Sequence, residues 1–160
     1  MNINEFISNC NKNPDVLIDG FFGEYRWLSN FIEVDVNFGG VIYPSVEHAY
    51  QAAKTLDLTV RKEFEKCTPG RAKSLGKTLA IREDWEVVKV AVMKSLVDQK
   101  FHDHERFRNL LLSTGSAKLV EGNWWHDNFW GDCWCKDRPL CVKPGKNMLG
   151  IILEQTRSSL

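Results

Sequence analysis

The early part of the chain has the short alternation of apolar and polar residues that is typical of β-strands. Residues 16–22 form an apolar run that ends at a glycine, and we expect a strand there. Residues 31–38 alternate between apolar and polar side chains before Gly39 and Gly40, and residues 41–43 are apolar again. Two such segments joined by a glycine pair predict a β-hairpin.

Beyond the hairpin, apolar residues recur at helical spacing. Ser45 is suited to be an N-cap, and Thr68 followed by Pro69 is a strong helix start. Asp84 caps the longest periodic segment. Because helices dominate and do not alternate with strands, the pattern predicts an α+β fold rich in helix. The expected helices cover residues 45–55, 60–67, 68–79, 84–101, 104–113 and 146–157, and a further short strand covers residues 118–121.

Length and composition fit one globular domain. A chain of 160 residues can bury about two-thirds of the surface that its unfolded form exposes. No internal repeat, low-complexity tract or linker divides it. We therefore expect residues 1–160 to form a single domain, with residues 1–13 as a loosely held N-terminal segment.

Charge and hydropathy narrow the class of function. Lys and Arg total 21 and Asp and Glu total 21, so the formal net charge is zero. The basic excess usual in proteins that bind duplex nucleic acid is therefore missing, although a local pocket for one or two phosphates fits the sequence. No apolar run approaches the roughly 18 residues of a transmembrane helix, and the start lacks the order of a signal peptide. With five cysteines read as reduced thiols, we expect a cytoplasmic protein that does not bind membranes.

The helix expected after Ser45 has polar side chains beside its apolar stripe. Glu47, Gln51 and Lys54 stand at i, i+4 and i+7 and share this face. One interpretation is a solvated face with a weak Glu–Lys pair. We favour a site in which carboxylate, amide and ammonium act together, because small alanines let a ligand approach and the hairpin offers a rigid platform. His48 points about 100° away from Glu47, and we expect it to be a structural, hydrogen-bonded histidine.

A segment near the end of the chain is rich in tryptophan, cysteine and turn residues. Four of the six tryptophans fall in residues 124–134, which indicates either a lined pocket or packing on the core. His126, Cys133, Cys135 and Cys141 are residue types that bind zinc, and four ligands would suffice. The C-x-C spacing is tighter than in the usual zinc motifs, so we favour free buried thiols and expect no metal.

Six segments match, in order, the motifs of a known family. One contains Leu-Ser-Asn-Phe, and another contains Glu-His-Ala-Tyr-Gln-Ala-Ala-Lys. Each motif alone is modest, but six in the right order over residues 20–157 are highly specific. The sequence therefore resembles the NADAR family. The matching segments are residues 22–31, 43–54, 70–76, 84–101, 129–132 and 145–150.

The resemblance implies a helix-rich α+β domain that hydrolyses N-glycosidic bonds. The substrates it implies are early riboflavin-pathway intermediates, which are ribose-phosphate metabolites, or ADP-ribose attached to a base such as guanine. Residues 133–135 and 137–141 look like an insertion relative to the family pattern, which bears on pocket shape and substrate choice more than on reaction class. By the same likeness, the functional residues are Glu47, Lys54, Trp130 and Asp132, and the substrate-binding residues include Trp27, Ser29, Asn30, Phe31, Gln51, Trp85 and Gly131.

Cleavage of a ribose–nitrogen bond builds positive charge on the sugar and requires a proton on the leaving nitrogen. Glu47 and Asp132 are our candidates for stabilising that charge, activating water and donating the proton. Alternatively, Lys54 with a pKa depressed by burial attacks C1′ and forms a Schiff base with the opened ribose, while Glu47 shuttles protons. The residue types leave both routes open, because Lys54 could instead only orient Glu47.

Further residues would hold the substrate. Trp85 or Trp130 would stack on the base, and Lys73 or Arg71, near a helix start, would meet a phosphate. We expect a ribosylated small molecule as the partner, or an ADP-ribosylated nucleic-acid base, with no cofactor and no protein partner. A module that binds ADP-ribose or nucleotides without catalysis would need the same aromatic walls. Substitution of Glu47 separates the two classes, because only an enzyme loses turnover while it still binds.

Overall fold

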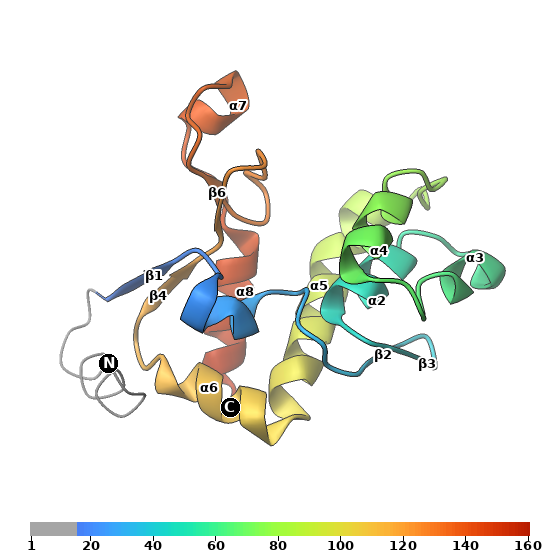
Figure 1. Ribbon diagram of the computed structural model, residues 1–160, viewed down its shortest axis with the longest axis horizontal. Coiled ribbons are helices and arrows are strands. Elements are labelled where there is room, and N and C mark those ends of the chain that lie inside the picture. Colours follow the sequence, from blue (N-terminus) through green and yellow to red (C-terminus); the bar gives the residue numbers. More distant parts are fainter. Residues whose placement is uncertain (1–15) are drawn as a thin grey trace. The chain divides into compact units, whose positions relative to one another are not determined.

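The computed structural model of the protein describes residues 16–160, which form two compact units. The terminal unit combines the described part of Met1–Ser29 with Glu105–Leu160, and the central unit is Asn30–His104. The chain thus passes from the terminal unit into the central unit and back again (Figure 1). The loose segment expected at residues 1–13 lies outside the described residues, and the single domain over residues 1–160 stays a prediction.

The central unit is a β-hairpin followed by helices. β2 and β3 pair antiparallel with Val36 opposite Tyr43. Gly39 and Gly40 between them have φ angles of 62° and 83°, the left-handed conformation that a two-residue hairpin turn requires. The bounds are β2 Val36–Phe38, β3 Val41–Tyr43, α2 Val46–Ala52, α3 Leu58–Lys62, α4 Pro69–Gly76 and α5 Trp85–His102.

The helix α2 forms part of the core of this unit. It packs against both α4 and α5 (Figure 1), and each of its residues is buried. Val46, Ala49 and Ala52 are completely inaccessible to solvent. Small side chains allow neighbouring helices to approach closely, so α2 is enclosed on all sides, including the side that carries its polar residues.

Helix starts in the central unit follow the sequence signals. Oγ of Ser45 and Oγ1 of Thr68 each accept a backbone N–H from within the first turn, at 3.3 and 3.2 Å. Asp84 stands at the N-cap of α5 but makes no side-chain cap, because its carboxylate binds Arg82 at 2.5 and 2.7 Å. Three helices end earlier than predicted, α2 at Ala52, α3 at Lys62 and α4 at Gly76, and α3 also begins earlier, at Leu58.

The terminal unit contains short parallel strands and helices. β1 pairs with β4, and β5 pairs with β6. α8 packs on β4, where Glu154 accepts the backbone N–H of Leu119 at 2.8 Å and Arg157 donates to the carbonyl of Ala117 at 2.9 Å. The bounds are β1 Leu17–Asp19, η1 Gly23–Leu28, α6 Glu105–Ser113, β4 Lys118–Val120, β5 Gly122–Asn123, β6 Asp132–Cys133, α7 Pro139–Val142 and α8 Met148–Ser158.

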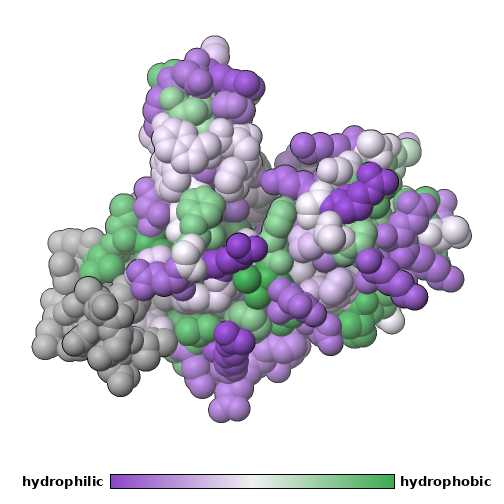
Figure 2. Space-filling view, in the orientation of Figure 1, coloured by the Kyte–Doolittle hydropathy of each residue, from purple (hydrophilic) through white to green (hydrophobic). Residues whose placement is uncertain are grey.

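Helices with short paired strands confirm the predicted α+β fold. The hairpin and the strand near residue 18 are also confirmed. η1, β5, β6 and α7 were not predicted, because elements this short show no hydrophobic period. Within residues 16–160, no helix is both long and apolar enough to cross a membrane. The face shown in Figure 2 mixes hydrophilic and hydrophobic residues.

Candidate active site

Glu47 lies in the first turn of α2, directly after the hairpin. Its backbone N–H donates to the carbonyl of Asn30 at 3.0 Å, which ties the helix start to the Leu-Ser-Asn-Phe segment. The ring nitrogens of the neighbouring His48 lie 2.7 Å from Oγ of Ser45 and 2.7 Å from the carbonyl oxygen of Cys67. His48 is therefore structural, as predicted, and its hydrogen bonds hold α2 in one rotation about its axis.

The Glu47 carboxylate is buried and hydrogen-bonded. Glu47 is 7% exposed and Gln51 is 5% exposed, and Nε2 of Gln51 donates to Oε1 of Glu47 at 2.8 Å. Gly76 of α4 leaves the space that Gln51 fills, because a Cβ at residue 76 would lie 1.7 Å from Oε1 of Gln51. The solvated-face interpretation is wrong. In the sequence, Gly76 is the signal that could have shown this enclosure, because an isolated helical glycine often marks close packing.

Lys54 does not belong to α2. The helix ends at Ala52, and the backbone N–H of Lys54 bonds the carbonyl of Gln51 at 3.2 Å in a tighter turn. The helical-wheel argument that placed Lys54 above Glu47 is therefore wrong in its geometry. Lys54 nevertheless interacts electrostatically with Glu47: burial lowers the pKa of Lys54, the Glu47 charge raises it, and the charges of Lys73 and Lys77 lower it. Lys77 belongs to no motif, so sequence reasoning missed it.

Aromatic side chains border this group of charges. Nζ of Lys54 lies 5.6 Å from the ring centroid of Tyr50, and that ring packs on Trp85 at 5.1 Å. Tyr50 and Trp85 are only 6% and 5% exposed, so Trp85 acts as packing behind Tyr50 rather than as an open stacking wall. Nζ of Lys73 lies 5.7 Å from the ring of Phe31. Phe31 is partly exposed and is the more accessible ring beside the lysines.

The remaining predicted site residues belong to the terminal unit. Oδ1 of Asp132 accepts the backbone N–H of Gly145 at 2.8 Å and lies 3.3 Å from Nζ of Lys136. The backbone N–H of Trp130 donates to Oδ1 of Asp127 at 2.8 Å. The Asp132–Gly145 bond fastens the Phe-Trp-Gly-Asp segment to the segment that precedes α8, and the Trp130–Asp127 bond closes the turn before it. Asp127 shapes this turn and was missed in the sequence.

Gly131 is placed by backbone packing. A Cβ there would lie 2.0 Å from the carbonyl oxygen of Glu121, so no other residue fits the position. Trp27 lies in η1 and Ser29 at its C-cap, where the Ser29 N–H donates to the carbonyl of Arg26. The structure thus brings together Asn30, Phe31, Glu47, Gln51, Lys54, Lys73 and Trp85 in the central unit, and it places Trp27, Ser29, Trp130, Gly131 and Asp132 in the terminal unit.

The tryptophan-rich segment forms a partly exposed aromatic cluster. The Trp134 ring contacts the rings of Phe22 and Trp124 at 6.0 and 5.4 Å, and Trp125 contacts Phe22 at 6.2 Å. Trp124 and Trp125 are 62% and 47% exposed, so the cluster is not part of the buried core. Nε1 of Trp134 donates to the carboxylate of Asp19, the last residue of β1, at 3.2 Å, which fixes the position of the Trp134 ring beside β1.

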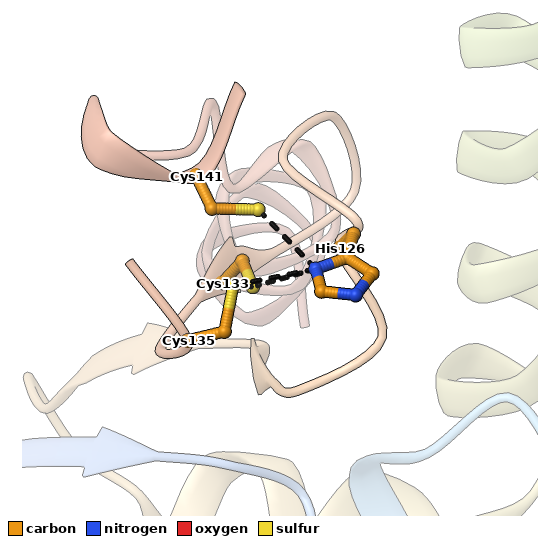
Figure 3. A group of neighbouring side chains, drawn as sticks. All are labelled: His126, Cys133, Cys135 and Cys141. Atoms are coloured by element: carbon orange, nitrogen blue, oxygen red, sulfur yellow. Dashed lines mark hydrogen bonds between the residues drawn. The ribbon is translucent and has the colours of Figure 1, made fainter. Parts of the chain in front are cut away.

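The structure also brings together the four residues considered for a metal. One ligand atom from each of His126, Cys133, Cys135 and Cys141 lies within 4.8 Å of the others (Figure 3). The three cysteines are free thiols. Burial raises the pKa of Cys135 and Cys141, whereas backbone and thiol hydrogen bonds outweigh burial at Cys133 and lower its pKa to about 6. The tight C-x-C spacing therefore does not keep these atoms apart.

Comparisons with known proteins identify the family of this fold. The family model described as NADAR domain matches residues 20–160, and so covers residues of both units. N-glycosidase YbiA of Escherichia coli is 36% identical over 140 residues, covering 86% of this chain and 82% of that protein. An N-glycosidase of Nostoc punctiforme is 34% identical over 142 residues, covering 85% of this chain and 86% of its own length.

A solved structure agrees with these matches. The NMR structure of the E. coli protein YbiA superposes with a TM-score of 0.77 at 34% sequence identity, over 91% of this chain and 84% of that chain. A riboflavin biosynthesis protein of Vibrio vulnificus is 31% identical over 144 residues, which are 85% of this chain and 36% of that longer protein. The chain belongs to the NADAR domain family.

Proposed function

We propose that the protein is an N-glycosidase that hydrolyses the ribose–nitrogen bond of a ribosylated small molecule. Relatives in E. coli and Nostoc punctiforme carry the name N-glycosidase, and riboflavin biosynthesis proteins of Vibrio vulnificus and Zea mays contain a similar segment. The observation that carries the proposal is the buried Glu47–Gln51 pair with Lys54 beside it. The substrates that fit are ribose-phosphate intermediates of riboflavin synthesis and ADP-ribose attached to a base.

Glu47 has the environment that this reaction needs. Cleavage of the C1′–N bond leaves positive charge on C1′ and the ring oxygen, and a carboxylate held in a buried site stabilises that charge more strongly than one in water. Gln51 fixes one carboxylate oxygen through its 2.8 Å hydrogen bond. The other oxygen is then in a defined direction from which it can activate a water for attack on C1′.

Lys54 supports a second version of the reaction. Burial lowers its pKa, which raises the fraction of neutral amine available for attack on C1′. The C1′–N bond breaks as the lysine nitrogen bonds C1′, the leaving nitrogen takes up a proton, and opening of the ribose ring gives a Schiff base. Water then hydrolyses that Schiff base and returns the free lysine. Glu47, whose charge interacts with Lys54, would shuttle the protons.

The lysines favour a phosphorylated substrate. Lys73 and Lys77 act on Lys54 as neighbouring positive charges, and Phe31 adjoins Lys73. Neighbouring positive charges attract an anionic group, and a substrate phosphate is such a group. Phe31 offers a ring on which a base can stack. Arg71 is exposed at the start of α4, where its backbone N–H donates to Oγ1 of the N-cap Thr68. It is the weaker candidate for binding the phosphate.

Asp132 would assist as a positioning residue or as the second carboxylate. Its Oδ1 already holds the Gly145 amide and adjoins Lys136. The contacts of Glu47 are therefore the stronger support, and the proposal rests on Glu47. The cytoplasmic location expected from the sequence also stays a proposal, in keeping with the free thiols of Cys67, Cys133, Cys135 and Cys141.

Glu47→Gln tests the proposal. The amide keeps the size of the side chain and still accepts the Gln51 hydrogen bond, so the fold should persist. Turnover should fall by about 10²–10⁴-fold, as is usual when a positioned acid or base is removed. The assay incubates the protein with phosphorylated ribosylamines and ADP-ribosylated bases and follows the released base by mass spectrometry.

Glu33→Gln is the matched control, because Glu33 is an exposed glutamate of the same unit. It should retain the wild-type rate. Near-normal turnover by Glu47→Gln would refute the assigned role. A wild-type protein that binds the compounds by calorimetry but releases no base from any of them would instead establish the non-catalytic binding module.

A further inference from the structure

Three cysteine sulfurs and one histidine nitrogen converge on a common centre in the terminal unit. Nδ1 of His126 lies 3.9 Å from Sγ of Cys133, 3.3 Å from Sγ of Cys135 and 3.5 Å from Sγ of Cys141. Figure 3 shows the three sulfurs turned toward one edge of the imidazole ring. The sulfurs of Cys133 and Cys135 are 3.2 Å apart, too far for a disulfide bond, which has a length of about 2.05 Å.

These separations fit a tetrahedral zinc ion. With Zn–S near 2.3 Å and Zn–N near 2.05 Å, tetrahedral angles require S···N distances of about 3.6 Å and S···S distances of about 3.8 Å. The S···N distances of 3.3, 3.5 and 3.9 Å bracket the first value. The Cys133–Cys135 distance must open by only about 0.6 Å, which small χ1 rotations accomplish.

The C-x-C segment lies at the end of β6. Cys133 ends β6, and the Trp134 N–H still donates to the carbonyl of Asn123 at 2.7 Å, although the chain bends at Trp134. Nε1 of Trp134 donates to the Asp19 carboxylate, while the sulfurs of Cys133 and Cys135 both lie beside Nδ1 of His126. The two cysteines therefore share one centre despite the single residue between them.

A shell of hydrogen bonds fixes the ligand positions. Oδ1 of Asn128 accepts the backbone N–H of Cys133 at 2.8 Å, and Nδ2 of Asn128 donates to the carbonyls of Leu140 and Lys143. Asn128 therefore links β6 to the short helix α7 that carries Cys141. Hydrogen bonds from residues that surround the ligands orient those ligands in metal sites.

The segment around α7 has little else to stabilise it. α7 spans only four residues, and its apolar Leu140 and Val142 are 80% and 64% exposed. A segment that buries so little apolar surface needs a cross-link to hold one conformation. Cys133 and Cys141 are nevertheless completely buried, so the thiols themselves form the small core of this region.

We propose that Nδ1 of His126 and the thiolates of Cys133, Cys135 and Cys141 bind one structural zinc ion. Binding displaces the protons that the three cysteines still carry and leaves a centre of net charge −1 with a neutral histidine protonated at Nε2; no oxidant or reductant is involved. Four protein ligands complete the tetrahedral shell, so the ion holds the loop and leaves no position for substrate. This proposal replaces the expectation of free thiols, and it does not depend on the proposed N-glycosidase activity.

Zinc content tests the site directly. Untagged protein produced with Zn²⁺ in the medium should contain about one zinc per chain by elemental analysis. Cys135→Ser and His126→Ala should each lose most of it. Cys67→Ser should keep it, because Cys67 is a free thiol of the central unit.

A second measurement covers the case in which a variant does not fold. Wild-type protein stripped with a mercurial and then reduced should bind one Co²⁺, with the visible bands of tetrahedral cobalt and a thiolate charge-transfer band. Zn²⁺ should displace the cobalt and raise the melting temperature above that of the stripped protein. Absence of zinc together with no cobalt spectrum would overturn the proposal, as would a Cys133–Cys135 disulfide found in the protein as isolated.

Because the ion is structural, brief exposure to EDTA should leave the N-glycosidase rate unchanged while the zinc stays bound. Release of the zinc by the mercurial should lower the melting temperature. A rate that drops at once with EDTA, before any loss of structure by circular dichroism, would contradict a purely structural ion. That result would leave Glu47 to be tested separately by its own variant.

Discussion

Replacing Gly76 with alanine tests whether close contact between α2 and α4 holds the Glu47–Gln51 pair. A Cβ at residue 76 would lie 1.7 Å from Oε1 of Gln51 and 2.6 Å from its Cδ. Non-bonded carbon and oxygen atoms do not approach this closely, so the Gln51 amide must move. That movement breaks the 2.8 Å hydrogen bond from Gln51 to the Glu47 carboxylate.

Two unfavourable contributions oppose one favourable contribution in Gly76→Ala. The lost hydrogen bond to a charged acceptor costs about 1.5–3 kcal/mol, and overpacking a closely packed interior costs about 1–3 kcal/mol. Alanine in place of glycine within a helix returns about 1 kcal/mol. The free energy of unfolding should therefore fall by about 1.5–5 kcal/mol, and turnover should fall as Glu47 loses its fixed orientation.

Gly70→Ala is the matched control, because Gly70 lies in the same helix and a Cβ there meets no atom within 4 Å. This variant should be as stable as the wild type or more stable, by up to about 1 kcal/mol. Urea denaturation measures both variants. In a Gln51→Ala background, most of the cost of Gly76→Ala should vanish, since the amide that the new methyl group displaces is gone. A Gly76→Ala protein as stable as Gly70→Ala would refute the reasoning.

Two further predictions concern lysines whose pKa is lowered by burial, the partly buried Lys54 and the fully buried Lys100. If Lys54 is the nucleophile, borohydride added during turnover should trap a ribose adduct on it. Lys54→Arg should then be inactive, because a guanidinium stays protonated. An unmodified mass of the wild-type protein after borohydride, together with substantial turnover by Lys54→Arg, would exclude the Schiff base. Burial lowers the pKa of Lys100 to about 7. Unfolding then takes up a proton between pH 7 and about 10, so the free energy of unfolding should rise with pH over this window. Lys100→Met should flatten that rise in urea titrations, and an equal slope in both proteins would contradict it.

Local signals predicted much of the central unit. The Gly39–Gly40 pair specified the hairpin turn, and Ser45 and Thr68 specified helix starts, because each acts through hydrogen bonds or φ angles within a few residues. The grouping of Glu47 with Gln51 followed from a single turn of helix. Contacts between residues a few positions apart can therefore be predicted from the local sequence pattern.

Local sequence signals did not predict where α2 ends or how completely it is buried. Alanines at 52 and 53 favour continuation of the helix, yet the chain leaves it at Ala52. The carbonyl of Lys54 instead accepts a hydrogen bond from the backbone N–H of Arg82 at 2.8 Å, and Arg82 lies 28 positions further along the chain. The enclosure of Glu47 likewise depends on α4 and α5. Tertiary contacts such as these override helix propensity and leave no trace in local periodicity.

The cysteine cluster shows a different limit of sequence interpretation. Zinc motifs usually have two to four residues between cysteines, so the C-x-C spacing taken alone argued against zinc. Here Cys133 ends β6 and the chain bends at Trp134, and the sulfurs of Cys133 and Cys135 both lie beside His126 while Trp134 bonds Asp19. The spacing of ligands is therefore informative only together with the backbone conformation between them. β6 is two residues long and has no period from which that conformation could be inferred, so four residues of compatible types were visible in the sequence and their convergence was not.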